Sequence, residues 1–160
     1  MKRTLALVMG LAACVLTTAP AAAKAASPLL GTWSLDIASL PVPPERKPKS
    51  VTFTFTEEAD GKWSTEVNII GQDGSVRHSK ATHPLDGTPT AVTGSDEADT
   101  VSTRLTAPNV LVMALSKGGQ PGSTRVYTVA PDGKSETETM VTFHDDGTPA
   151  MRTVTFIRVK

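Results

Sequence analysis

The chain has 160 residues, which suits a single domain, and its 16 basic and 16 acidic side chains give a formal net charge of zero. Phosphate binding needs clustered Lys and Arg, so this balance argues against a nucleic-acid partner. The only cysteine is Cys14. Disulfides within the chain and cysteine-based zinc sites are therefore excluded.

Residues 1–25 have the order of a signal peptide. A positively charged start precedes an apolar run, Leu5–Leu16, which is too short to span a bilayer. Small residues at Ala23 and Ala25 offer cleavage sites. We therefore expect an exported protein, periplasmic or secreted, with one domain over residues 26–160.

A second interpretation of the leader involves its cysteine. Leu11–Cys14 resembles the lipobox at which bacterial lipoproteins are cut and lipidated, and lipidation would anchor the protein in the envelope through Cys14. The apolar run continues past Cys14 to Leu16, which favours the soluble product. Cleavage after Ala25 removes three basic residues and no acid, so 13 basic side chains remain against 16 acidic ones, a formal charge of −3. A membrane partner is expected only for the lipidated form.

The mature chain begins with a strand and a proline-rich interruption. Gly31–Asp36 alternates between apolar and polar residues, with Trp33 and Leu35 on one face. Pro41–Pro48 then contains four prolines. Proline lacks an amide donor and disfavours helical geometry in the preceding residue, so we expect an irregular or polyproline-like crossing.

From Lys49 onward the sequence alternates with a period of two residues, which predicts strands. Val51, Phe53 and Phe55 show this most clearly. Asp-Gly pairs separate most of the runs and supply the positive backbone angles of tight hairpins. Beyond the strand at Val51, we predict a segment without regular structure at Thr88–Asp96 and strands at Trp63–Ile70, Ser75–Pro84, Thr100–Ala107, Val110–Ser116, Ser123–Ala130, Ser135–His144 and Met151–Val159.

About nine short strands without a convincing helix predict an all-β domain, either a barrel or a sandwich. Nearly every connection is a tight hairpin, whereas a Greek-key sandwich needs long crossovers. Closure also removes the exposed edges of such strands. We therefore predict an antiparallel up-and-down meander barrel of about eight to ten strands.

Gly31-Thr32-Trp33, ahead of a series of hairpins, resembles the start of the calycin superfamily of lipocalins and fatty-acid-binding proteins. More closely, residues 31–160 resemble small bacterial exported lipocalin-like proteins of undefined function. These combine a Gly-Thr-Trp start, a Pro-rich spacer, Asp-Gly hairpins and a middle segment like Leu85–Val101. The helix-turn-helix lid of fatty-acid-binding barrels is missing here. The resemblance implies a shared barrel architecture more strongly than a shared ligand, because proteins of one fold can have different functions.

The same resemblance implies a closed end for the barrel. In lipocalins the tryptophan packs across that end beneath an arginine near the end of the last strand, and Trp33 and Arg158 match these positions. A guanidinium stacked on the indole could donate hydrogen bonds to carbonyls at the rim. We expect Gly31, Trp33 and Arg158 to form a structural plug.

Arg125-Val126-Tyr127 has the Arg-x-Tyr pattern with which fatty-acid-binding proteins hold a ligand carboxylate. Residues i and i+2 of a strand share a face, so both side chains could bind one anion. In those proteins the pair lies on the final strand, whereas here two more strands follow. Arg125 and Tyr127 are the candidate ligand-binding residues; on the outer face they would be ordinary surface residues.

The histidines carry weak metal signals. His78 and His83 lie at odd separation on one predicted strand and so point to opposite faces. His144 and the two aspartates after it lie at a hairpin whose residues already have a turn role. The acidic run 96–99 suits a solvated loop better than a calcium site. No metal site or cofactor is predicted.

The sequence contains no recognisable catalytic constellation. Acid pairs such as Glu136 and Glu138 are expected to face solvent. We therefore predict a non-enzymatic protein that binds a small apolar or amphipathic ligand in its barrel. The alternative is a periplasmic protein-binding module, an inhibitor or an envelope assembly factor, that acts through loops 41–48 and 84–100. Ligand identity and oligomeric state are left open.

Overall fold

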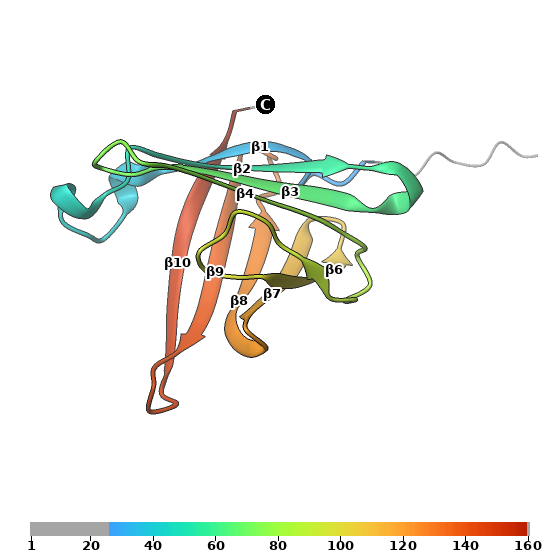
Figure 1. The fold of residues 1–160 in the computed structure, drawn as a ribbon. Coiled ribbons are helices and arrows are strands. Elements are labelled where there is room, and N and C mark those ends of the chain that lie inside the picture. The colour runs from blue at the N-terminus through green and yellow to red at the C-terminus, as the bar shows by residue number, and fades with distance from the viewer. Residues whose placement is uncertain (1–25, 160) are drawn as a thin grey trace, which may run out of the picture.

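The computed structural model describes residues 26–159, which form one antiparallel sheet of ten strands curled into a barrel (Figure 1). The predicted leader, with Cys14 and the cleavage sites at Ala23 and Ala25, lies outside the described residues. The strands are β1 (Gly31–Leu35), β2 (Ser50–Glu57), β3 (Trp63–Ile70), β4 (Val76–His83), β5 (Thr90–Ala91), β6 (Thr100–Ala107), β7 (Val110–Lys117), β8 (Gln120–Val129), β9 (Ser135–Phe143) and β10 (Pro149–Arg158).

The strands follow one another around the barrel in chain order, and β1 pairs with both β2 and β10. This arrangement confirms the predicted all-β meander. On the remaining side a single bridge joins β4 to the segment after β5. There the N–H of Lys80 donates to the Thr93 carbonyl at 3.0 Å, and the N–H of Thr93 donates back at 2.9 Å. The barrel is therefore nearly closed.

The prediction of about nine strands missed β5, which lies in the segment expected to lack regular structure. Only Thr90 and Ala91 form this strand, and they pair with the start of β6. Its neighbours explain its length, because Pro89 has no amide to donate and Gly94 takes a positive φ of 71° that turns the chain. So short a strand leaves no alternation to detect in the sequence.

The predicted Asp-Gly turns share one arrangement. At four of them the aspartate carboxylate accepts a hydrogen bond from the N–H two residues later, at 2.8 to 3.0 Å, and the intervening glycine has a φ between 68° and 91°. These turns are at Asp73, Asp86, Asp132 and Asp146. Local chemistry thus determines where most of the strands reverse.

Two single-turn 3₁₀ helices form here, where the sequence predicted none: η1 (Ile37–Ser39) precedes the proline-rich segment and η2 (Pro44–Arg46) lies within it. Pro44 occupies the first position of η2, where a missing N–H breaks no hydrogen bond. The ammonium group of Lys47 donates to the Ala38 carbonyl at 3.0 Å and joins the two turns. Among residues 26–159, no helix is long and apolar enough to cross a membrane.

One end of the barrel is filled. Trp33 is fully buried, and its indole N–H donates to the Leu29 carbonyl at 2.8 Å. Arg158 faces Trp33 in the β1–β10 register, with its guanidinium carbon 4.0 Å from the centre of the indole ring. Gly31 has a φ of 122°, which side chains disfavour. The guanidinium donates to three carbonyl oxygens of the surrounding backbone, those of Pro28, Leu30 and Gly133.

Candidate functional site

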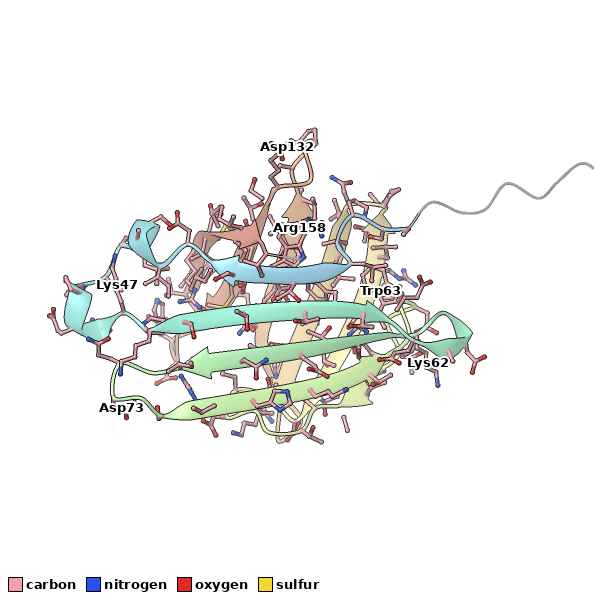
Figure 2. All side chains as sticks on the ribbon, turned by 90° about the horizontal axis from the view of Figure 1, so that it is seen from above. Lys47, Lys62, Trp63, Asp73, Asp132 and Arg158 are labelled. Carbon is pink, nitrogen blue, oxygen red and sulfur yellow. The ribbon has the colours of Figure 1, made fainter. Side chains whose placement is uncertain are left out.

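A cavity of about 610 Å³ lies inside the barrel, toward the end opposite Arg158 and its carbonyl partners. Figure 2 shows Lys47 and Asp73 at one end of the strands β2 to β4, with Lys62 and Trp63 at the other end. The cavity lining includes Arg46, Pro48 and Gln72, the chain neighbours of Lys47 and Asp73. Pockets of roughly 300–1,000 Å³ are typical of small-molecule sites. Most of the wall is apolar and comes from alternate residues of many strands, among them Val51, Phe53, Val67, Val101, Met113 and Phe156.

Two loops frame the mouth of the cavity. One is the proline-rich segment, which contributes Pro41, Val42 and Pro48, and the other is the segment 94–98. Both belong to the loops that the sequence offered as protein-binding surfaces. The structure instead places part of each against the cavity.

The segment 94–98 is held close to the barrel. A Cβ on Gly94 would lie 2.1 Å from the carbonyl oxygen of His78, so only glycine fits this approach. The Ser95 hydroxyl accepts hydrogen bonds from the N–H groups of Glu97 and Ala98 at 3.1 and 3.2 Å. These contacts position the Glu97 carboxylate beside the mouth.

Arg125 and Tyr127 both line the cavity, so their side chains face inward. The Arg125 side chain is only 11% exposed and forms ion pairs with Glu97 and, at 3.4 Å, with Glu138. Tyr127 is fully buried, with its ring 5.7 Å from that of Phe53. Burial raises the pKa of Tyr127 well above its usual value, so its hydroxyl stays protonated. The pair converges on the cavity, but the guanidinium already has two acidic partners.

Glu136 and Glu138 are buried, which corrects the expectation that these acids face solvent. They alternate on β9 in phase with Met140, and their register partners on β10, Phe156 and Val154, belong to the barrel interior. Burial, reinforced by the charge of Glu138, raises the pKa of Glu136 to about 8. Burial also raises the pKa of Glu138, against the opposing charge of Arg125.

The alternation of β9 was the only signal in the sequence for these inward glutamates. It correctly assigns Glu136, Glu138 and Met140 to one face of the strand. Because two of these three residues are glutamates, the pattern predicts that this face is exposed to solvent. The side of the sheet is decided by the neighbouring strands β8 and β10, whose residues at these register positions belong to the barrel interior. That information is not local to β9.

His83 and Thr65 form a second buried polar pair that sequence reasoning did not single out. The threonine hydroxyl and the imidazole Nε2 are 2.8 Å apart, and both residues line the cavity. Burial lowers the pKa of His83 and favours the neutral ring. In nucleophilic catalysis an imidazole activates a hydroxyl and is itself oriented by a third group, often a carboxylate. Within residues 26–159, no carboxylate is paired with the His83 imidazole.

The remaining sequence candidates lie away from the cavity centre. His78 is exposed while His83 is buried, which confirms that they point to opposite faces. His144 lies at the exposed β9–β10 turn. In the part of the chain that the structure describes, no group of three or more His, Cys, Asp or Glu residues is arranged to hold a metal ion.

No protein-family model matches the sequence, and no curated protein matches it. Two solved structures of point variants of the fluorescent protein UnaG are similar in fold. One superposes with a TM-score of 0.56 at 14% identity, covering 83% of this chain and 97% of UnaG. The other gives 0.53 at 14% identity, covering 81% and 95%. With the ten-stranded meander, this likeness shows that the chain shares the fold of that protein, an antiparallel β-barrel.

Proposed function

We propose that this chain is an exported lipocalin-like protein that binds a small apolar or amphipathic ligand inside its barrel and does not transform it. The observation that carries the proposal is the cavity of about 610 Å³, with apolar walls and a few buried polar groups. The signal-peptide order of residues 1–25 supports export to the periplasm or the medium. The Gly31-Thr32-Trp33 motif resembles the start of small bacterial exported lipocalin-like proteins, which also supports export.

The side chains that line the cavity indicate the chemical character of the ligand that would bind. Apolar side chains from β2, β3, β6, β7 and β10 would bury a hydrocarbon portion, and burial of that portion would drive association. Arg125, Tyr127 and Glu138 cluster on β8 and β9 and would orient a polar group. An amphipathic ligand satisfies both parts of the cavity.

A cavity-filling substitution tests this proposal. Ala81 is buried and lines the cavity, so Ala81→Phe should occupy part of the ligand volume. Ala114→Phe is the matched control, because Ala114 is exposed on β7. We expect the neutral dye Nile red to bind the unaltered protein and the control, and to lose at least about tenfold in affinity with Ala81→Phe. Equal binding by all three proteins would place the dye elsewhere and count against the cavity.

A protein-binding role is the second candidate, favoured by exposed apolar residues on one hairpin. Phe143 is 65% exposed and Met151 is 71% exposed. Figure 1 shows the hairpin of β9 and β10 extending beyond its neighbours. If this hairpin binds an envelope protein, a double substitution of Phe143 and Met151 by serine will remove a partner from pull-downs that the parent protein retains. Unchanged pull-downs would dismiss this candidate.

A further inference from the structure

Tyr127 and Glu138 lie directly opposite each other in the register of β8 and β9, and both line the cavity. Tyr127 is fully buried and Glu138 is 4% exposed. Among residues 26–159, neither the Tyr127 hydroxyl nor the Glu138 Oε1 atom has a hydrogen-bond partner. Tyr127 and Glu138 thus lie side by side in the cavity wall, and each has a buried polar atom with unused hydrogen-bonding capacity.

The charge of Arg125 is already compensated. Its guanidinium pairs with Glu97 on one side, and Nη1 lies 3.4 Å from Glu138 Oε1 on the other, an ion-pair distance without hydrogen-bond geometry. A ligand carboxylate placed here would have to displace Glu97 and would approach a second buried acid, Glu138. Like charges in a poorly solvated site repel strongly, which disfavours an anionic head group at this depth.

We propose that Tyr127 and Glu138 form a subsite for an uncharged ligand group that donates a hydrogen bond, a hydroxyl or an N–H. Glu138 accepts a hydrogen bond from the ligand, and the Tyr127 hydroxyl, which can donate or accept, forms the second hydrogen bond. An alcohol satisfies both side chains at once, since its oxygen accepts as well as donates. This assignment rests on the proposed function, because it names the head group of the ligand that the cavity holds.

Exposed cationic side chains at the mouth of the cavity would favour an anionic ligand instead of an uncharged one. Arg46 and Arg152 line the outer part of the cavity and are exposed. An anionic amphiphile could bind with its head group there and its chain inward. Water screens these exposed charges, whereas Tyr127 and Glu138 are buried, so the buried pair should dominate the choice of ligand.

Three probes that share a ten-carbon chain separate these possibilities. Decanol donates a hydrogen bond, methyl decanoate is uncharged but can only accept one, and decanoate is an anion. Their affinities for the full chain, expressed with its own leader, are measured by displacement of Nile red. We expect decanol to bind about three- to tenfold more tightly than methyl decanoate, the difference made by one net hydrogen bond. We also expect decanol to bind more tightly than decanoate.

Tyr127→Phe locates the preference in the subsite. It removes a hydroxyl that has no hydrogen-bond partner among residues 26–159, so folding should be unaffected while the advantage of decanol over methyl decanoate falls about threefold or more. Thr103→Val is the matched control, because its buried hydroxyl is also unpartnered but Thr103 does not line the cavity. Glu138→Gln provides a second variant and should also reduce the advantage of decanol.

The outcomes are distinguishable. Tighter binding of decanoate, or equal binding of decanol and methyl decanoate, overturns the subsite and leaves the binding barrel intact. An advantage of decanol that Tyr127→Phe and Glu138→Gln both leave unchanged also overturns it. Failure of Nile red and every probe to bind overturns the proposed function itself.

Discussion

The guanidinium of Arg158 lies over the indole of Trp33, and the two residues face each other across the β1–β10 pairing. This contact joins the first strand of the described barrel to the last. The indole is fully buried, while the guanidinium holds the backbone segment that crosses this end of the barrel. The cavity lies toward the opposite end, because neither Trp33 nor Arg158 is among its lining residues.

Trp33→Ala tests how much this end contributes to stability. Removing a fully buried indole leaves a cavity in the core and should lower the free energy of unfolding by about 3–5 kcal/mol, measured by urea denaturation. Met151→Ala, at a site that is 71% exposed, should change it by about 0.5 kcal/mol or less. A loss below about 1 kcal/mol for Trp33→Ala would mean that the indole is not part of the packed core.

Glu136 should make stability depend on pH. Its pKa is raised to about 8 in the folded protein, so between pH 4.5 and 8 the folded state holds a proton that the unfolded state releases. Stability must then fall as pH rises through this window. Glu136→Gln cannot ionise, so its free energy of unfolding should match the parent near pH 4.5 and exceed it by up to about 5 kcal/mol at pH 8. A difference that is the same at both pH values would contradict the raised pKa.

Gly94→Ala tests the bridge that nearly closes the barrel. The new Cβ would lie 2.1 Å from the His78 carbonyl oxygen, and backbone on both sides prevents an easy adjustment. We expect a loss of at least about 2 kcal/mol in unfolding free energy, with faster hydrogen exchange at the Lys80 and Thr93 amides. Gly87→Ala is the control: its φ of 91° is equally unsuited to alanine, but nothing lies within 4 Å of the added atom. Equal losses for both substitutions would show that the approach to β4 is unimportant.

Local patterns in the sequence predicted most of the barrel. Alternation assigned Trp33, Phe53 and Phe55 to an inward face, and the Asp-Gly pairs located the hairpins where carboxylate-to-amide hydrogen bonds now stabilise them. These features depend on residues a few positions apart. The two-residue β5 was missed because a strand that short has no period of its own.

The polar part of the cavity could not be predicted in the same way. The contact between Arg125 and Glu97 joins residues 28 positions apart, and the inward direction of Glu138 depends on the strands on either side of β9. The Arg-x-Tyr spacing did identify two residues that line the cavity. The spacing could not show that the Arg125 guanidinium forms ion pairs with two acids, Glu97 and Glu138.

Native mass spectrometry of the full chain tests most directly whether the barrel carries a small molecule. The protein is purified from the envelope or medium of the cells that produce it, beside its Ala81→Phe variant. We expect a small-molecule adduct on the parent protein that is reduced or lost in the variant. The bare protein mass in both samples, or the same adduct on both at equal occupancy, would contradict it.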